Sequence, residues 1–207
     1  MRLAIAGEGW PFILPGFALV VLFALLQWRA AAGAALVLAL FVTWFFRDPV
    51  RAIPGDPETL VSPADGKVIE IVSGPGGETR VSIFLSIFNV HVNRSPVAGE
   101  VTDVTRRPGK FLAAWKHEAS SDNAQASVTV RTPRGEVRFV QITGLIARRI
   151  VCHLAPGALV ARGERYGLIR FGSRVDLFLP PAAEPAVRVG DRVRGGSDVI
   201  ARWRIAQ

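Results

Sequence analysis

The chain has few of the residues from which metal and redox sites are built. Of its 207 residues one is a cysteine, Cys152, and three are histidines. A single cysteine cannot form an internal disulfide, and so few thiol and imidazole groups offer too few ligands for a metal cluster. The sequence therefore predicts no metal site, and either a reducing compartment or a fold without disulfides. His153 lies in an apolar, strand-like context and is predicted to be structural, whereas His117 is predicted to be solvated.

Charged residues are nearly absent from the N-terminal segment, which contains only Arg2, Glu8 and Arg29. Two apolar runs follow each other there, 11–27 and 30–46. Each would be about 25 Å long as a helix, close to the hydrocarbon core of about 30 Å. A second run argues against a cleaved signal peptide. We predict a membrane-associated helical hairpin that spans the bilayer or enters one leaflet; a buried hairpin of a soluble protein is the alternative.

The charges around this hairpin predict both the domain division and the orientation. Residues 1–46 form the predicted hairpin, and residues 47–207 form a charged, strand-rich domain. Arg47 and Arg51 follow the second run, and together with Arg2 they outnumber the single arginine between the runs. The positive-inside rule then predicts a protein of the cell (inner) membrane with its strand-rich domain on the cytoplasmic side.

The formal net charge of +8 raises the question of a nucleic-acid partner. The arginines are scattered along strands and turns, and no Lys/Arg-rich helix with interleaved aromatic residues is present. Attraction to an anionic membrane surface explains the basic charge without a second partner. We therefore expect a membrane partner and no nucleic acid.

After residue 60 the chain consists of short Val- and Ile-rich segments separated by Gly or Pro, with one candidate helix at 109–119. Two pairs of segments repeat internally. Residues 62–68 and 95–101 share the pattern S-P-x-x-G-x-V, and residues 157–169 and 190–200 share G-x-x-V-x-x-G. The predicted fold class is mainly β: a compact antiparallel β-sandwich or barrel-like domain of two related β-units, preceded by the helical hairpin.

Three positions could carry nucleophilic or acid–base chemistry. Ser173 follows Gly172 at the start of a strand; a Gly-Ser pair is usually a turn, and no G-x-S-x-G elbow surrounds it. His91 lies at a strand end, where an imidazole would be reachable. Asp65 is in a tight turn, where it either forms the turn or orients a histidine. The residues alone leave a structural and a functional interpretation open for each.

Several blocks together resemble a known family. They are "FFRDPVRAIP", "VSPADGKV", "FNVHVNRSPVAGEV", "QITGLIARRI" and "GERYGLIRFGSRVDLFLP", which occur in this order between about residues 45 and 200. In this the chain resembles the phosphatidylserine decarboxylase proenzymes, in particular the short form. Members usually carry an Asn-Glu-Arg-like stretch where this chain has Asn123, Ala124 and Gln125. The family plan also includes an apolar N-terminal anchor.

The resemblance implies a zymogen that cleaves its own chain between Gly172 and Ser173. The Ser173 hydroxyl would attack the carbonyl of Gly172 and convert the amide to an ester, and β-elimination would then release the upstream chain. The matching position for the general base is His91, and the matching orienting carboxylate is Asp65. Ser173 would become a covalent pyruvoyl group, which is the cofactor that the family uses.

The resemblance also implies the reaction. The pyruvoyl group would form a Schiff base with the amine of phosphatidylserine and accept the electrons left by CO2, and phosphatidylethanolamine would be released. His91 is a candidate proton donor in this step, and Arg94 and Arg174 are candidates to hold the phosphodiester. The two cleavage fragments would stay together as a heterodimer, and a second copy of the chain is a further candidate partner.

Two other functions fit part of the pattern. One is a membrane-anchored, non-catalytic carrier or binding module, in which Lys67 would carry a lipoyl-type group or His91 a phosphoryl group. The other is a hydrolase that uses Asp65, His91 and Ser173 on an external ester. Both alternatives predict an uncut chain, so self-cleavage distinguishes them from the decarboxylase.

Overall fold

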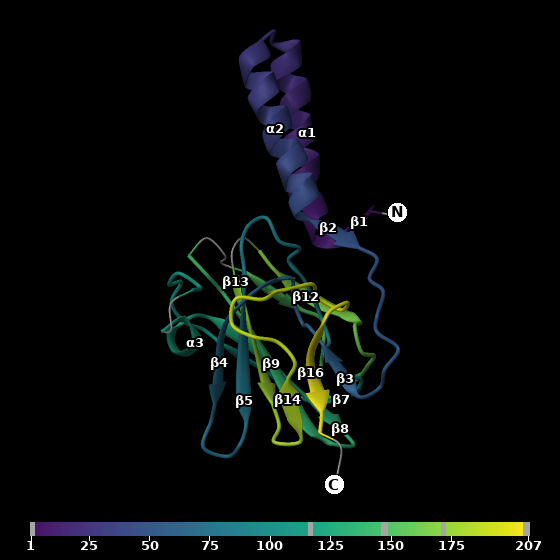
Figure 1. Ribbon diagram of the computed structural model, residues 1–207. Coiled ribbons are helices and arrows are strands. Elements are labelled where there is room, and N and C mark those ends of the chain that lie inside the picture. Colours follow the sequence, from purple (N-terminus) through teal and green to yellow (C-terminus); the bar gives the residue numbers. More distant parts are fainter. Residues whose placement is uncertain (1–2, 116–117, 146–148, 171–172, 205–207) are drawn as a thin grey trace. The chain divides into compact units, whose positions relative to one another are not determined.

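The computed structural model describes residues 3–115, 118–145, 149–170 and 173–204. The chain divides into two units, Met1–Val50 and Arg51–Gln207 (Figure 1). Each unit is held together by its own contacts, and each is therefore described by itself.

The first unit contains the predicted helical hairpin. Its elements are β1 (Leu3–Ile5), the 3-10 helix η1 (Gly7–Gly9), α1 (Trp10–Leu25), α2 (Arg29–Phe45) and β2 (Arg47–Pro49). Between the two helices Gln27 takes a left-handed backbone conformation, with φ of 59°. Where the helices pack, a Cβ on Gly16 would lie 3.3 Å from the Cβ of Ala39, so glycine permits the close approach.

Most large apolar side chains of the hairpin are exposed within this unit; for example Leu25 is 76% and Val37 is 70% exposed. The stretch Gly7–Leu25 is long and apolar enough to cross a membrane, and α2 is a shorter apolar helix. Exposed apolar surface of this extent is costly in water and is typical of a segment that contacts a membrane or another protein.

The second unit is built from antiparallel strands and is mainly β, as predicted. Its central sheet has eight strands in the order β11-β7-β8-β9-β13-β5-β4-β15, and it curls into a half-barrel (Figure 1). Two three-stranded sheets, β10-β12-β6 and β14-β16-β3, complete the unit. The strands are β3 (Thr59–Val61), β4 (Gly66–Ser73), β5 (Thr79–Leu85), β6 (Val92–Arg94), β7 (Gly99–Arg107), β8 (Gln125–Thr132), β9 (Gly135–Ile142), β10 (Ile150–Cys152), β11 (Leu159–Val160), β12 (Arg165–Ile169), β13 (Ser173–Leu179), β14 (Ala183–Pro185), β15 (Arg192–Val193) and β16 (Val199–Trp203).

The core lies on the concave face of the central sheet. In β13 the side chains of Val175, Leu177 and Leu179 are fully buried in it, because successive strand residues point to opposite faces. Ser173 has the same parity and therefore belongs to the core face. β13 pairs with β5 on one side and β9 on the other, so it runs through the middle of the sheet.

The internal repeat predicted from the sequence is present as two equivalent β-units. Ser62 Oγ donates to the carbonyl of Ala64 over 2.7 Å, and Ser95 Oγ donates to the carbonyl of Val97 over the same distance. The S-P-x-x-G-x-V segments therefore form the same turn twice.

The second pair of repeated segments completes each unit. Gly66 pairs with Val193 of β15, and Gly99 pairs in the same way with Val160 of β11. A Cβ on Gly66 would lie 2.3 Å from a carbonyl oxygen of β5, and one on Gly99 would lie 2.2 Å from a carbonyl oxygen of β8. The repeated glycines are thus required because a neighbouring backbone passes too close for any side chain.

The candidate helix at 109–119 is wrong for the described residues. The only helix there is α3 (Ala119–Asp122), with one turn. The backbone of Lys110 instead bonds to Asp122 and Ala124, over 2.7 and 3.1 Å. Asn123 holds the segment in place, because its side-chain amide bonds to both backbone groups of Leu112. Asn123 therefore has a structural role.

Candidate functional site

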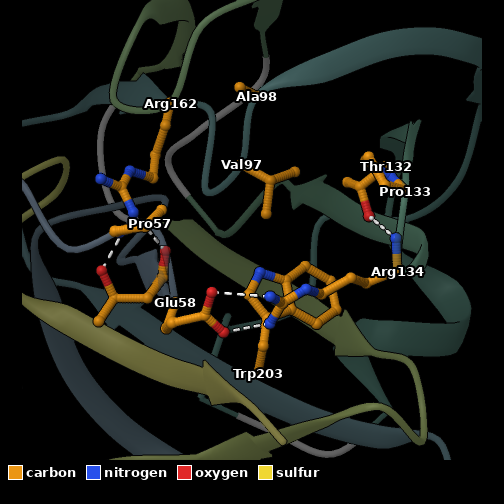
Figure 2. A pocket seen from close by; sticks show the side chains of 10 residues that line it. Pro57, Glu58, Val97, Ala98, Thr132, Pro133, Arg134, Arg162 and Trp203 are labelled. Carbon is orange, nitrogen blue, oxygen red and sulfur yellow. Dashed lines mark hydrogen bonds and ion pairs between the residues drawn. The ribbon is translucent and has the colours of Figure 1, made fainter. Parts of the chain in front are cut away.

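One cavity of the second unit lies away from the predicted site. It has a volume of about 410 Å³ and is mostly apolar, with Trp203 at its centre (Figure 2). The guanidinium of Arg134 in its wall is paired with Glu58, and that of Arg162 is bound by backbone carbonyls. Arg134 lies in the β8–β9 turn, whereas Ser173 lies beside the other end of β9, roughly 25 Å along the strand. The predicted site residue Ser173 therefore lies at the opposite end of the sheet from this cavity.

Ser173 is the first residue of β13 and pairs with Leu85 of β5. Its side chain is fully buried, and its Oγ has no hydrogen-bond partner in the described part of the chain. A buried hydroxyl without a partner costs about 1–3 kcal/mol, and packing alone does not explain it. Gly172, the other residue of the predicted cleavage site, lies outside the described residues.

His91 directly precedes β6 and is also buried, with 2% of its surface exposed. Its carbonyl accepts a hydrogen bond from the amide of Ile169 over 3.3 Å. Ile169 ends β12, four residues before Ser173. The sheet pairing of β6 with β12 thus brings the predicted base to the end of the strand that leads into the predicted cleavage site.

The contacts of His91 define which ring nitrogen is basic. Nδ1 lies 3.0 Å from the carbonyl oxygen of Asn89. Because a carbonyl oxygen only accepts, Nδ1 carries the proton, and in the neutral ring Nε2 is then the nitrogen able to accept one. Asn89 itself is fixed by the amide and hydroxyl of Ser86, both of which donate to its side-chain oxygen.

Two buried amides, Asn93 and Gln141, lie between these elements and were missed in the sequence analysis. Gln141 Nε2 donates to Asn93 Oδ1 over 2.8 Å. Asn93 follows His91 by two residues, and Gln141 lies directly opposite Val175 in the β9–β13 pair. Asn93 Nδ2 and Gln141 Oε1 are buried without a partner in the described residues. The sequence contained a signal for Gln141, because it follows Val137 and Phe139 at two-residue spacing and is therefore a polar residue on an apolar strand face.

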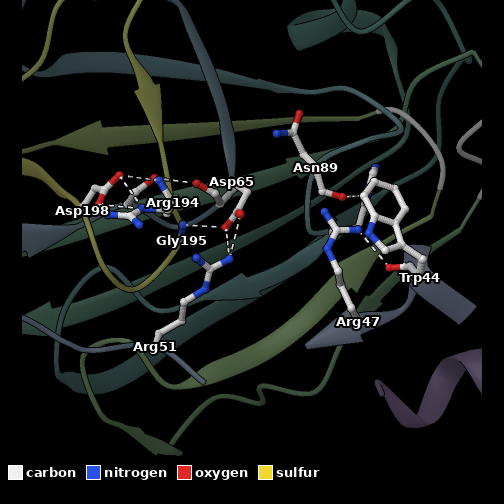
Figure 3. A network of polar contacts seen from close by, with 11 residues as sticks. Trp44, Arg47, Arg51, Asp65, Asn89, Arg194, Gly195 and Asp198 are labelled. Carbon is white, nitrogen blue, oxygen red and sulfur yellow. Dashed lines mark hydrogen bonds and ion pairs between the residues drawn. The ribbon is translucent and has the colours of Figure 1, made fainter. Parts of the chain in front are cut away.

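Asp65 lies in an ionic cluster with Arg51 (Figure 3). Arg51 NH2 lies 2.8 and 2.7 Å from its two carboxylate oxygens, and the amide of Gly195 donates to Oδ1 over 2.8 Å. The turn around Asp65 is the S-P-x-x-G-x-V turn of the first β-unit, where the second unit has Ala98. The carboxylate is therefore not needed to form this turn, which favours a functional interpretation.

Arg174 is one of the largest fully buried side chains of the protein and lies on the convex face of the sheet. Its Nε is 2.6 Å from Asp176, and its NH2 is 2.9 Å from Glu70 and 2.7 Å from the hydroxyl of Ser82. Its charge is thus matched inside the protein. As a phosphodiester contact Arg174 stays a prediction, and binding would require it to leave these partners.

Arg94, the second predicted phosphodiester contact, ends β6. Its NH1 donates to the carbonyl of Gly163 over 3.1 Å, and its stem lies against Gly196. These are the equivalent glycines of the two β-units, so Arg94 links the repeated segments. Its role in substrate binding also stays a prediction.

The remaining candidate groups do not form a metal site. No group of three or more potential metal-binding side chains occurs among the residues described. The Cys152 thiol is buried, and desolvation raises its pKa. A protonated, buried thiol is a poor nucleophile and a poor ligand. His153 is exposed, and His117 lies outside the described residues.

Comparisons with known proteins match the part of the chain that contains these candidate residues. A family model described as phosphatidylserine decarboxylase matches residues 38–201, a range that includes Asp65, His91 and Ser173. Similar proteins named phosphatidylserine decarboxylase proenzyme occur in several bacteria. That of Symbiobacterium thermophilum is 51% identical over 209 residues, covering 97% of this chain and 96% of the relative.

Two further relatives with the same name are similar over nearly the whole chain. The protein of Geotalea uraniireducens is 47% identical over 203 residues, which is 95% of each chain. The protein of Nitrosomonas eutropha is 47% identical over 208 residues, covering 97% of this chain and 95% of the relative. The similarity therefore includes the apolar hairpin as well as the β-domain.

Proposed function

The chain belongs to the phosphatidylserine decarboxylase family, and from this premise we propose that it cleaves itself between Gly172 and Ser173 and then decarboxylates phosphatidylserine. The observation that carries the proposal is the buried Ser173 hydroxyl, which has no partner among the described residues. A nucleophile held without a competing hydrogen bond is ready to attack, and the strand pairing fixes its position.

The cleavage step uses groups of this chain alone. His91 Nε2 takes the Ser173 hydroxyl proton as Oγ bonds to the carbonyl carbon of Gly172, and it gives this proton to the Ser173 nitrogen as the Gly172–Ser173 C–N bond breaks. The resulting ester is lost by β-elimination, in which the Ser173 Cα proton and the Gly172 carboxylate leave. The new N-terminal enamine tautomerises to an imine, and water hydrolyses this imine, which releases ammonia and leaves a pyruvoyl group.

Two groups position His91 in this proposal. The carbonyl of Asn89 holds the Nδ1 proton, which directs Nε2 as the base. We assign Asp65 the role of orienting the histidine, as the family resemblance implies. The ion pair with Arg51 holds that carboxylate in one orientation.

Ser173 fits the position of the group formed from it. It begins a strand that is hydrogen-bonded on both sides, and its side chain lies in a buried environment that excludes water. The pyruvoyl group supplies a carbonyl that condenses with the substrate amine and withdraws the electrons left when CO2 departs. His91 is then the group of this chain that can return a proton to the product.

The two products of cleavage are held together by the sheets. Residues 173–207 contain β13, β14, β15 and β16, and β13 lies between β5 and β9 of the upstream fragment. β15 pairs with β4, and β16 pairs with β3. Separation would expose this shared core, so we propose a stable heterodimer of fragments.

We propose that the hairpin anchors the protein to the inner membrane with the β-domain on the cytoplasmic side. The apolar stretch Gly7–Leu25 is long enough to cross a bilayer. Arg47 and Arg51 follow α2, whereas Arg29 at the start of α2 is the single arginine at the opposite end of the hairpin, and the positive-inside rule then favours this side.

Intact mass of the full chain in detergent tests the proposal. We expect two masses, residues 1–172 and a pyruvoyl-ended 173–207, and a single uncut mass for Ser173→Ala and for His91→Gln. A folded wild-type chain that stays uncut would contradict the proposal. An uncut chain that reacts with a fluorophosphonate would instead support the hydrolase, and one that does not react would support the carrier module.

A further inference from the structure

A cationic groove lies beside the proposed active site. It has a volume of about 770 Å³, and we define it by Lys67, Phe84, Ser86, Phe88, Arg192 and Arg194, with Asp65 in its wall. Phe84 and Ser86 flank Leu85, the residue that pairs with Ser173. The side chain of Phe84 points to the face of β5 opposite that of Leu85. The groove adjoins the proposed active site through Asn89, which lines it and whose carbonyl oxygen lies 3.0 Å from His91 Nδ1.

Two cations face each other in this groove. Lys67 and Arg192 are direct partners in the β4–β15 pair, and both side chains are exposed. No carboxylate of the described residues forms an ion pair with either of them. Like charges directly opposite each other destabilise a strand pair. Repulsion between the two positive charges therefore destabilises this strand pair, and an anion bound between the side chains would remove the repulsion.

The internal repeat shows that the fold does not need these cations. The equivalent pair in the second β-unit is Glu100 with Leu159, in β7 and β11. That pair has the same register and the same adjacent glycine, yet it carries no positive charge. Lys67 and Arg192 are therefore a feature of one unit only, the unit that also contains Asp65.

The rest of the groove is amphiphilic. Arg194 adds a third cation, already paired with Asp198 over 3.0 Å (Figure 3). Phe88 is 65% exposed at the rim. Trp115, 61% exposed, packs edge-on against Phe84 with ring centroids 5.8 Å apart. Two cations without carboxylate partners beside exposed aromatic rings match a ligand with an anionic group joined to apolar chains.

We propose that this groove binds the phosphodiester of the phospholipid substrate, with Lys67 and Arg192 as its specificity-determining contacts. The proposal rests on the decarboxylase function. The two side chains would bind the non-bridging phosphate oxygens, and Phe88 and Trp115 would contact the glycerol and the first acyl carbons. This assigns the phosphate to the groove, whereas Arg94 and Arg174 are already engaged inside the domain.

The test uses the full chain in mixed micelles of a non-ionic detergent and phosphatidylserine. Lys67→Gln, Arg192→Gln and the double variant are compared with wild type for self-cleavage, by intact mass, and for CO2 release against the surface fraction of substrate. Arg131→Gln is the matched control, because it removes one exposed cation from β8 at the other end of the sheet.

We expect complete self-cleavage in all of these variants, since that reaction involves no lipid. Each groove variant should raise KM at least about tenfold, as expected for a lost charge-assisted contact, with kcat changed much less. Arg131→Gln should have the KM of wild type. A KM within twofold of wild type in the cleaved double variant would overturn the proposal.

Salt separates a direct contact from general attraction to the micelle. At about 1 M salt the screening length is about 3 Å, so long-range attraction is lost while a direct contact persists. The KM difference between wild type and the double variant should therefore remain at high salt. Its disappearance, or an equal effect in Arg131→Gln, would show a non-specific surface effect and exclude the proposed site.

A binding measurement keeps the proposal testable if the wild-type chain proves uncut. Glycerophosphoglycerol carries the phosphodiester but has no amine, carboxylate or acyl chain, and can be titrated into the detergent-solubilised chain. We expect saturable binding by wild type and by Arg131→Gln, and none by the double variant over the same range. Equal affinity for glycerophosphoglycerol in all three proteins would overturn the assignment, whether or not the Gly172–Ser173 bond is cleaved.

Discussion

The side-chain amides of Gln141 and Asn93 connect the strand beside Ser173 to the strand that follows His91, through a hydrogen bond of 2.8 Å. Both side chains are fully buried. Because a buried amide can be satisfied only by protein groups or bound water, each of these residues fixes the position of the other. The pair therefore determines how closely the proposed base and nucleophile can approach.

This relationship predicts a non-additive effect of substitution. Gln141→Leu should destabilise the folded chain by about 1–3 kcal/mol, because it leaves Asn93 with both amide groups unpaired in the core. Asn93→Leu should cost less, because Gln141 Nε2 keeps a second bond of 3.3 Å to the carbonyl of Val151, and the double variant should cost less than the sum of the two. Thermal unfolding of the detergent-solubilised proteins measures this.

Self-cleavage provides the second measurement on the same variants. We expect both single variants to cleave more slowly than wild type, since His91 is then less well positioned. Gln141→Glu loses the donor to Asn93 Oδ1 and places a carboxylate in the core, so it should cleave no faster than Gln141→Leu. Strictly additive unfolding energies, together with a wild-type cleavage rate, would contradict a role for this pair.

The hydroxyl of Ser173 should lower the free energy of unfolding of the uncut chain. This hydroxyl is buried without a partner among the described residues, so its removal relieves a penalty of about 1–3 kcal/mol. The comparison needs two uncut chains: His91→Gln, and His91→Gln with Ser173→Ala. We expect the second to unfold at the higher temperature. An equal or lower midpoint would mean that the hydroxyl has a stabilising partner.

The sequence predicted the features that depend on local patterns. The helical hairpin follows from apolar composition, and the repeated β-units follow from S-P-x-x-G-x-V. In both units the glycine is fixed by a nearby carbonyl oxygen, so the pattern in the sequence reflects a backbone requirement at Gly66 and Gly99. Ser173 was predicted from its position in the best-matching block, and its burial adds a physical reason.

Features that depend on distant pairing were not predicted. The polar face of residues 109–119 suggested a helix, but the backbone of Lys110 bonds to residues that follow it by more than ten positions. The Lys67–Arg192 pair and the Gln141–Asn93 bond each join segments far apart in the chain. The alternation of apolar and polar residues shows which face of a strand a side chain occupies. Which residue lies beside it on that face depends on the register of the complete sheet.

Substitution of Arg174 should lower the free energy of unfolding rather than raise the KM for the substrate. Arg174→Met would leave the buried carboxylate of Asp176 and that of Glu70 without this cation, at a cost of about 3–5 kcal/mol. Arg138→Met is the control on the same face: its side chain is 39% exposed and lies 3.6 Å from Glu78, so its loss should cost less than about 1 kcal/mol. A stable Arg174→Met variant with a raised KM would instead support a substrate contact.

Tyr166, the single tyrosine of the chain, should control stability at alkaline pH. Complete burial raises its pKa well above the ordinary value of 10.0, and the nearby Cys152 contributes less. The folded state therefore keeps the phenol neutral, while the unfolded chain ionises near pH 10. The stabilising contribution is complete below that pH and is lost as the pH rises from there toward the folded-state pKa.

Tyr166→Phe removes this dependence and also a buried hydroxyl that has no partner in the described residues. Ring packing against Phe139, with centroids 4.9 Å apart, is retained. We expect the variant to be at least as stable as wild type near neutral pH, and its advantage to grow above pH 10 by up to about 1.4 kcal/mol per pH unit. Cys152→Ala, the control, should remove only the loss that begins near pH 9, because burial also raises the pKa of that thiol, and should keep the loss above pH 10 that Tyr166 causes. Parallel stability curves for Tyr166→Phe and wild type, with phenolate absorbance appearing before unfolding, would show that the phenol titrates in the folded protein.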